Sequence, residues 1–552
     1  MKAHNAAVKE IAHKVRNFYK QKIPFRISHG STNSTRTPHD RPTVDTSPLS
    51  NVIHVDVQHK ICTVQPNVPM DKLVATTLQY NLVPPVVMEF PGITVGGGYA
   101  GTSGESSSFR HGFFDRTINS VEMVLGNGEV VVATPDNEHS DLFHGGAGAV
   151  GSLGIATLVE LQLIDAQPFV ETEYHPVSSM SEAREIISKS IEDEKIEYVD
   201  GIMYAADKGA VITGRLAKEP LAGVPIQSFS RPGDPWFYKH VLEKISGRSN
   251  NTKVTIKETI KETIKETIKE TIPLDEYLFR YDRGGFWVGD SAFKYTGVPN
   301  NKWTRWFLDD FLHTRMLYRA LHASGSARQY LVQDLALPDD TVEEFVEYVE
   351  KELNIWPLWL CPLKQSPMPS LHPHDCRDIP AMKEDGVTLA PMLNVGVWGE
   401  PKNIDVTNYD HFVEMEKNLE EELIRLGGMK WGYGKHFYDQ NKFWAMFQQP
   451  RMVTNATSND TAVEDGVEDG VEDRVEDRVE DGVNVQWYDD LRRKYHGEGL
   501  PTMWDKITVD VSRERERRKN DWRTKVLAIW PMGGVYSIWK AIQSKDYLHH
   551  RK

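Results

Sequence analysis

Apolar and polar residues alternate with a period of two along several stretches of the first 165 residues, and this alternation predicts β-strands. Residues 71–81 differ, because their apolar positions follow helical spacing after Asp71 at the cap position. One strand pair surrounds Asn127-Gly128, a dipeptide typical of a tight hairpin turn. The first third therefore predicts an α+β domain with mixed sheets. Its strand-like segments lie at residues 53–58, 60–66, 119–134 and 154–165.

After Pro168 the pattern changes to longer helical segments mixed with strands. The spacing predicts helices at residues 181–193 and 341–353, and strands at 209–214 and 389–398. We interpret this part as a second α+β domain. It is rich in tryptophan, which suits a pocket for a large apolar ligand, although core packing accounts for most such residues. The tryptophans are Trp236, Trp287, Trp303, Trp306, Trp356, Trp359 and Trp398.

Two low-complexity tracts interrupt the second half. IKET occurs four times in residues 256–271, and VEDG or VEDR occurs five times in residues 463–482. A period of four is too short for a solenoid unit, so we expect solvated surface insertions without a catalytic role. The resulting division of the chain is 1–166, 167–430 with an insertion at 256–272, 431–525 with the acidic insertion at 463–482, and a tail at 526–552.

Charge argues against one class of partner. The chain has a formal charge of −15, and the acidic tract alone contributes −8 with its ten acids and two arginines. The remainder shows no broad basic field, so we expect no nucleic-acid binding. Three cysteines are too few for a disulfide framework and fit a reducing compartment.

No stretch approaches the roughly 20 apolar residues that cross a bilayer. The nearest, residues 526–539, is broken by Pro531 and follows a basic run at 513–525. Basic residues beside an aromatic apolar segment suit peripheral contact with a membrane surface. The alternative is a tail packed on the core of the protein itself.

Two glycine- and hydroxyl-rich segments, residues 25–36 and 91–112, carry the clearest chemical signal. Such backbone approaches a ligand closely and presents N–H groups to an anion such as a pyrophosphate. The alternative is that these segments are only tight turns. Two matches to G-x-G-x-x-G do not indicate a Rossmann fold, because no helix and βαβ unit follow them. These matches are Gly96, Gly98, Gly101 and Gly146, Gly148, Gly151.

Other chemistries find little support. His372, His374 and Cys376 form H-x-H-x-C within a proline-rich loop, but no fourth ligand is evident, so we predict no metal site. Neither a G-x-S-x-G nor an H-E-x-x-H motif occurs, which argues against a hydrolase.

Residues 91–112, the hairpin at 120–131 and residues 141–163 together resemble the FAD-binding domain of the vanillyl-alcohol-oxidase, or PCMH, type. Within that superfamily the chain is most similar to the delta(24)-sterol reductases of the Diminuto/seladin group. The resemblance implies a PCMH-type FAD-binding domain of two subdomains, followed by an α+β substrate or cap domain. The residues that carry it lie in segments 27–36, 104–115, 355–364, 395–401 and 427–510.

The resemblance also assigns cofactor-binding residues. It implies noncovalent FAD, because His29 falls where noncovalent members keep a small residue. The first phosphate loop would comprise Ser28, His29, Gly30, Ser31, Thr32 and Asn33. The second loop and the residues against the flavin would comprise Gly96, Gly97, Gly98, Gly101, Thr102, Ser103, Gly104, Glu105, Ser106, Ser107, Ser108, Gly154 and Ile155.

The activity that the resemblance implies is reduction of a carbon–carbon double bond in a sterol side chain, with NADPH as donor, at the surface of the endoplasmic reticulum membrane. Sterol-reductase relatives carry an N-terminal membrane anchor, and we expect no such anchor in this chain. One alternative keeps the fold but acts as an FAD-dependent oxidase or dehydrogenase of an alcohol or related small molecule. Another is a binding protein that keeps the fold without turnover.

Reduction of an isolated double bond needs a proton donor beside the hydride donor. The candidates lie in family-like segments of the second half, and each has a purely structural alternative as a core-edge or surface residue. They are Glu400, His436, Tyr438 and Lys364.

Overall fold

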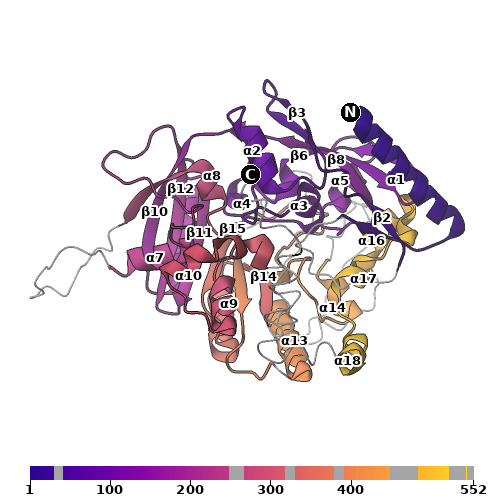
Figure 1. The fold of residues 1–552 in the computed structure, drawn as a ribbon. Coiled ribbons are helices and arrows are strands. Elements are labelled where there is room, and N and C mark those ends of the chain that lie inside the picture. The colour runs from indigo at the N-terminus through magenta and orange to yellow at the C-terminus, as the bar shows by residue number, and fades with distance from the viewer. Residues whose placement is uncertain are drawn as a thin grey trace, which may run out of the picture.

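The computed structural model describes residues 1–29, 41–247, 267–317, 330–377, 391–406, 408–447, 483–520 and 543. It confirms the α+β class, with an N-terminal domain in indigo and purple above a second domain in magenta and orange (Figure 1). In the part of the chain described, no helix combines the length and apolar character needed to span a membrane.

The N-terminal domain is built on a five-stranded antiparallel sheet of order β3-β4-β8-β6-β7. The strand-like segments 53–58 and 60–66 pair as β3 and β4, and the predicted hairpin at Asn127-Gly128 forms between β6 and β7. Gly128 in its turn has a φ of 83°, a conformation that favours glycine. The antiparallel pairing also confirms that this is not a Rossmann unit. The strands are β3 Val52–Asp56, β4 Ile61–Val64, β8 Gly154–Gln162, β6 Ile118–Leu125 and β7 Val130–Ala133. Two small sheets pair β1 Arg26–Ser28 with β2 Thr43–Asp45, and β5 Leu82–Val83 with β9 Ile164–Asp165.

The first helix, α1 (Lys2–Gln21), does not follow from the sequence pattern above. Its buried residues Val8, Ile11, Ala12 and Val15 recur at helical spacing and pack in one cluster with Ile155. The helix therefore supports the sheet from outside. The other helices of this domain are α2 Met70–Leu78, α3 Val95–Gly101, α4 Ser108–His111, η1 Phe114–Thr117 and α5 Ser140–Gly146.

The second domain contains an eight-stranded antiparallel sheet of order β13-β10-β12-β11-β15-β16-β14-β17. Helices α6, α12 and α13 and the π-helical turn η4 cover one face and share a core with it. The other face belongs to a core that continues into the N-terminal domain. The strands are β10 Phe169–Val177, β11 Tyr198–Ala205, β12 Lys208–Ala217, β13 Ile268–Pro273, β14 Leu331–Pro338, β15 Leu358–Leu363, β16 Met392–Gly399 and β17 Met429–Lys430. The helices and turns are α6 Met180–Glu192, α7 Phe237–Ile245, α8 Leu274–Leu278, α9 Val288–Thr296, α10 Lys302–Phe307, η2 Asp309–Phe311, α12 Val342–Tyr348, η4 Val349–Leu353 and α13 Tyr409–Arg425.

The last IKET repeat corrects the expectation that the whole tract is solvated. It begins the edge strand β13, where Glu270 is 1% exposed. Glu270 accepts a hydrogen bond from Tyr174 and pairs with His240 at 2.7 Å and Lys244 at 2.5 Å. These partners and the pairing with β10 allow a polar repeat to be buried. Residues 256–266, the acidic tract at 463–482 and the tail at 526–542 and 544–552 lie outside the described residues.

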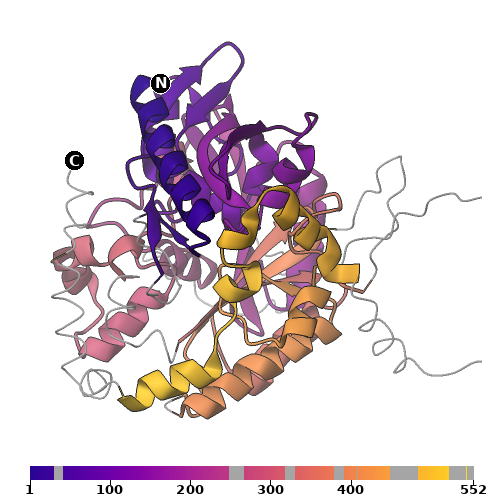
Figure 2. The same cartoon turned by 90° about the vertical axis from the view of Figure 1, so that its right-hand side faces the viewer.

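Helix α16 returns to the N-terminal domain, as the upper yellow helices in Figure 2 show, whereas α18 lies beside α13 of the second domain. Tyr488 donates to Ser152 Oγ at 2.7 Å, and Arg492 donates to the carbonyl of the same serine at 2.8 Å. The first domain is therefore completed by residues from the far end of the chain. The helices and turn are α14 Gln440–Ala445, α16 Val483–Lys494, η5 Gly497–Gly499, α17 Met503–Ile507 and α18 Val511–Asn520.

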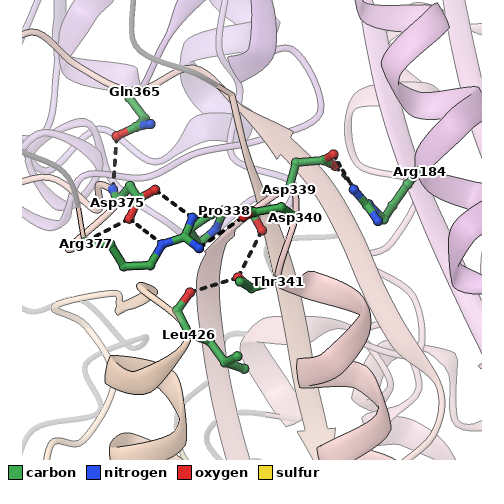
Figure 3. A network of polar contacts seen from close by, with 9 residues as sticks. All are labelled: Arg184, Pro338, Asp339, Asp340, Thr341, Gln365, Asp375, Arg377 and Leu426. Atoms are coloured by element: carbon green, nitrogen blue, oxygen red, sulfur yellow. Dashed lines mark hydrogen bonds and ion pairs between the residues drawn. The ribbon is translucent and has the colours of Figure 1, made fainter. Parts of the chain in front are cut away.

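A polar network ties the turn after β14 to three other parts of the second domain (Figure 3). Arg184 of α6 pairs with Asp339 at 2.6 Å, and Arg377 pairs with Asp340 at 2.9 Å. Thr341 donates to the carbonyl of Leu426, just after α13, at 2.8 Å. The network connects α6, the loop after β15 and the end of α13.

Candidate functional site

A cavity of about 490 Å³ is lined by residues of the N-terminal domain, the second sheet and α17. This volume lies within the roughly 300–1,000 Å³ typical of ligand sites. Loops and helix α3 of the N-terminal domain form one wall, and inward side chains of β14, β15 and β16 form the opposite wall. The cavity is therefore placed where a cofactor in the first domain can meet a substrate held by the second.

The N-terminal wall is lined by glycines that leave the backbone accessible. A β-carbon on Gly101 would meet no atom within 4 Å, whereas one on Gly96 would lie 2.8 Å from Pro66 Cβ. Gly96 must therefore remain without a side chain for the backbone to pack here. The further glycines on the cavity are Gly97, Gly104, Gly146, Gly151 and Gly154.

Cationic side chains lie at the glycine-rich wall. Arg26 and Lys506 line the cavity, and Lys506 Nζ donates to the carbonyls of Val150 at 2.7 Å and Gly151 at 3.0 Å. Arg26 Nε is buried and has no hydrogen-bond partner among the residues that the structure describes. Burial lowers the pKa of the Arg26 guanidinium. An orphaned buried donor beside bare backbone suits an anionic group, as the pyrophosphate of a dinucleotide would provide.

The opposite wall is aromatic. Phe286 lies between Trp359 and Trp398, with ring centroids 5.5 Å and 4.3 Å from theirs, and Phe90 lies 5.6 Å from Phe286. Trp431 completes this wall, against Gly104. Packed rings of this kind form a rigid apolar surface suited to a flat hydrocarbon or heteroaromatic ligand.

Three buried carboxyl groups, those of Glu89, Glu105 and Asp334, also line the cavity. Burial raises the pKa of Glu89, and burial together with the neighbouring Glu89 raises the pKa of Glu105 well above its usual range. Burial raises the pKa of Asp334 to about 6. An apolar pocket with several carboxyl groups held toward the protonated form can donate protons to a bound ligand.

Asp334 is held by donors on two sides. Asn394 Nδ2 donates to Asp334 Oδ1 at 3.0 Å, and the Tyr433 hydroxyl donates to Oδ2. Trp431 Nε1 in turn donates to Asn394 Oδ1 at 2.7 Å. The chain of bonds fixes the amide orientation of Asn394 and links the aromatic wall to the carboxyl group.

The structure brings nine of the predicted cofactor residues to the cavity: His29, Gly96, Gly97, Gly101, Ser103, Gly104, Glu105, Gly154 and Ile155. Others support the loop from behind it. Gly98 packs under Met88 and Phe114, and Ser108 Oγ accepts a 2.8 Å hydrogen bond from the backbone of Glu105. Those away from the cavity wall are Ser28, Gly98, Thr102, Ser106, Ser107 and Ser108. Gly30, Ser31, Thr32 and Asn33 lie outside the described residues.

The four residues predicted as proton donors do not line this cavity. Lys364 and Glu400 follow the ends of β15 and β16 and are exposed. His436 is fully buried beside the Trp431 carbonyl at 3.2 Å, and burial lowers its pKa well below the usual value. Tyr438 is 4% exposed, and burial raises its pKa. Strand ends and core positions thus place all four away from the space available to a ligand.

Several cavity residues were missed by sequence reasoning. Asn394 is the one polar residue of the otherwise apolar strand β16, and Asp334 lies beside Gln333 in the mostly apolar strand β14, so this pattern was a usable signal. Glu89 and Lys506 offered no such sequence signal, because each reaches the cavity only through the packing of distant segments.

Comparison with known proteins agrees with this geometry. The family model described as the FAD binding domain matches residues 5–134. The glycines, the cations and the orphaned Arg26 Nε fit this cofactor, and the predictions of FAD and of an FAD-linked oxidoreductase are confirmed.

The chain is also similar to whole proteins. It is 26% identical to the delta(24)-sterol reductase of Homo sapiens over 407 residues, which cover 72% of this chain and 71% of that protein. It is 26% identical to the delta(24)-sterol reductase of Pisum sativum over 426 residues, or 73% and 71% of the two chains. The chain is also 27% identical to cytokinin dehydrogenase 9 of Oryza sativa subsp. japonica over 164 residues, which cover 29% of this chain and 31% of that protein. The predicted resemblance to delta(24)-sterol reductases is confirmed.

Proposed function

We propose that this FAD-linked oxidoreductase, similar over most of its length to delta(24)-sterol reductases, reduces a carbon–carbon double bond of a sterol-like substrate. The observation that carries the proposal is the pairing, within one cavity, of a glycine-rich cationic wall with an aromatic wall that contains buried carboxyl groups. The first suits a dinucleotide, and the second suits a hydrocarbon that must be protonated as it is reduced.

The residues that would hold FAD are Gly96, Gly97, Gly101, Arg26 and Lys506. When bound, FAD would supply the hydride for the reduction. Phe286, Trp359 and Trp398 would hold an apolar substrate and exclude water.

The external donor in this proposal is NADPH, as the similarity to sterol reductases suggests. Because sterols are held in bilayers, the proposal includes peripheral contact with a membrane, which the sequence predicts for the basic and apolar residues after 512.

The test is an anaerobic titration of the purified FAD-loaded protein with NADPH, followed by addition of a sterol with an unsaturated side chain. We expect NADPH to bleach the oxidised-flavin absorbance and the sterol to restore it, with one saturated product per flavin. Bleaching by an alcohol, with oxygen alone restoring the flavin colour, would instead identify an oxidase or dehydrogenase.

A matched pair of variants tests the aromatic wall. Trp398→Leu should raise KM for the sterol about tenfold, since it removes buried contact area, with little effect on reduction by NADPH. Trp303→Leu is the control, because Trp303 is 80% exposed and does not line the cavity. Equal KM values for the two variants would place the sterol elsewhere.

A further inference from the structure

Glu89 at the cavity shares one buried arginine, Arg280, with a second carboxyl group, that of Asp200; Arg280 is 1% exposed. Its Nη2 lies 3.0 Å from Glu89 Oε1 and 2.9 Å from Asp200 Oδ2. The ring centroids of Tyr277 and Tyr281 lie 4.1 Å and 4.8 Å from its Cζ, so the guanidinium is caged in this position. One fixed positive charge therefore faces more than one carboxyl group.

Asp200 interacts more strongly with the Arg280 guanidinium than Glu89 does. It accepts hydrogen bonds from Arg280 at 2.9 Å, from the Tyr281 hydroxyl at 2.7 Å and from Trp359 Nε1 at 3.2 Å. Three donors stabilise a carboxylate. Asp200 does not line the cavity, so it balances Arg280 from behind the wall.

Glu89 then shares Arg280 with Asp200, and Glu105 forms no ion pair with the residues that the structure describes. Both oxygens of Glu89 are buried and accept no hydrogen bond of good geometry from the described residues, although Arg280 is near. The carboxyl group of Glu105 meets the backbone N–H of Glu89, and Glu105 is 8% exposed. Two adjacent carboxylates in such surroundings would repel each other, so the protonated forms are favoured.

Asp334, the third carboxyl group, is arranged differently. It accepts hydrogen bonds from Asn394 and Tyr433, and these donors favour its ionised form. It is therefore better suited to orienting its neighbours than to carrying a transferable proton at neutral pH.

The backbone around Glu105 is also fixed. Its N–H donates to Ser108 Oγ and its carbonyl accepts from the Ser108 N–H, both at 2.8 Å. The preceding Gly104 packs against Trp431 and Leu363. Glu105 thus stands at the junction of the glycine-rich loop and the aromatic wall, where a substrate would meet the cofactor.

We infer that Glu105 is the acid that protonates the substrate double bond and that Glu89 resupplies its proton. The inference rests on the proposed function. The Glu105 O–H bond breaks as a C–H bond forms at one alkene carbon, while the other carbon receives a hydride from the reduced flavin. The alkene gains two electrons, the flavin loses two, and the carboxylate left at Glu105 takes a proton from Glu89, which water replenishes. A nicotinamide donor returns the electrons to the flavin.

The test compares Glu105→Gln, Glu89→Gln and Asp334→Asn in the FAD-loaded protein, with Glu171→Gln as control, because Glu171 of β10 is half-buried and does not line the cavity. We expect Glu105→Gln to bind FAD and to be reduced by NADPH within about twofold of the unsubstituted protein, because that step needs no acid. Reoxidation by the sterol should slow by about 10²-fold or more, the usual contribution of a general acid. Glu89→Gln should keep the first turnover and slow later ones.

A second readout does not depend on turnover. The infrared carbonyl band of a buried protonated carboxylic acid should be present at pH 7 in the unsubstituted protein, shift in D₂O and weaken in Glu105→Gln. If Glu105→Gln does not retain FAD, the same infrared band is measured in Glu89→Gln instead. The inference then requires that Glu89→Gln weaken this band.

The outcomes separate the two proposals. If the sterol reoxidises Glu105→Gln at a rate within threefold of that of the unsubstituted protein, the role of Glu105 is overturned. A loss of sterol reoxidation confined to Asp334→Asn would overturn it as well. If the unsubstituted protein is reduced by NADPH but no sterol reoxidises it, the proposed function fails, whereas the infrared band still reports whether Glu105 is protonated.

Discussion

Gly104 packs directly against Trp431: a β-carbon on Gly104 would lie 2.8 Å from Trp431 Cη2. Gly104 belongs to the glycine-rich loop of the N-terminal domain, and Trp431 follows the last strand of the second domain. Trp431 is in turn held by its 2.7 Å hydrogen bond to Asn394. This contact brings the cofactor loop and the substrate wall together across the cavity, so its loss should affect both.

Gly104→Val should empty the FAD site. Its side chain would collide with Trp431 and with Leu363, because a β-carbon on residue 104 would lie 2.9 Å from Leu363 Cδ2, and the loop must move. We expect the flavin absorbance per protein to fall at least tenfold after purification. Gly233→Ala is the control, because a β-carbon there meets nothing within 4 Å. Full flavin content in Gly104→Val would show that this loop does not hold the cofactor.

Asp334→Asn should change how stability depends on pH. Because the folded pKa, about 6, lies above the ordinary 3.8, the folded protein binds this proton more tightly and loses stability as pH rises between those values. The loss is at most about 3 kcal/mol. Denaturant unfolding at pH 4 and pH 7 should therefore show that the free energy of unfolding of the variant increases, relative to that of the unsubstituted protein, as pH rises. The exposed control Asp207→Asn should parallel the unsubstituted protein, and a parallel profile for Asp334→Asn would contradict the prediction.

Lys506→Met should weaken FAD binding about tenfold, or roughly 1.4 kcal/mol, because it removes a cavity cation and two hydrogen bonds to the Val150 and Gly151 carbonyls. The measurement is a fluorescence titration of the apoprotein with FAD. Lys442→Met is the matched control, since Lys442 pairs only with the exposed Glu421 among the described residues. Equal Kd values for both variants would remove Lys506 from the site.

Lys430→Met should destabilise the fold by about 3–5 kcal/mol. Lys430 is 1% exposed and its Nζ lies 2.8 Å from Glu420 and 3.4 Å from Glu416, so its loss leaves two buried carboxyl groups without their cation. Thermal unfolding should show a large fall in Tm. Lys494→Met removes only a half-exposed pair with Asp141 and should cost less than about 1 kcal/mol. Similar Tm values for the two variants would indicate that the buried triad contributes little.

Local patterns were enough to predict much of the first domain. The hairpin at Asn127-Gly128 and the strand after Gly154 follow from turn chemistry and period-two alternation, which depend on neighbours in sequence. Helix α1 was missed although Val8, Ile11, Ala12 and Val15 have helical spacing. Likewise, the last IKET repeat has a solvated composition, yet β13 is buried because His240, Lys244 and Tyr174 surround Glu270.

The sequence by itself determined the α+β class, the glycine-rich loops and the FAD-linked chemistry, because these reside in contiguous motifs whose backbone conformation is local. Only the tertiary structure decided which acids meet the cavity. Glu89, Glu105, Asp334 and Lys506 come from four separate segments, and the protonation of a carboxyl group depends on burial and on nearby charges. Those quantities come from packing between distant segments, and for the same reason Glu400 and Lys364 lie at exposed strand ends, away from the site.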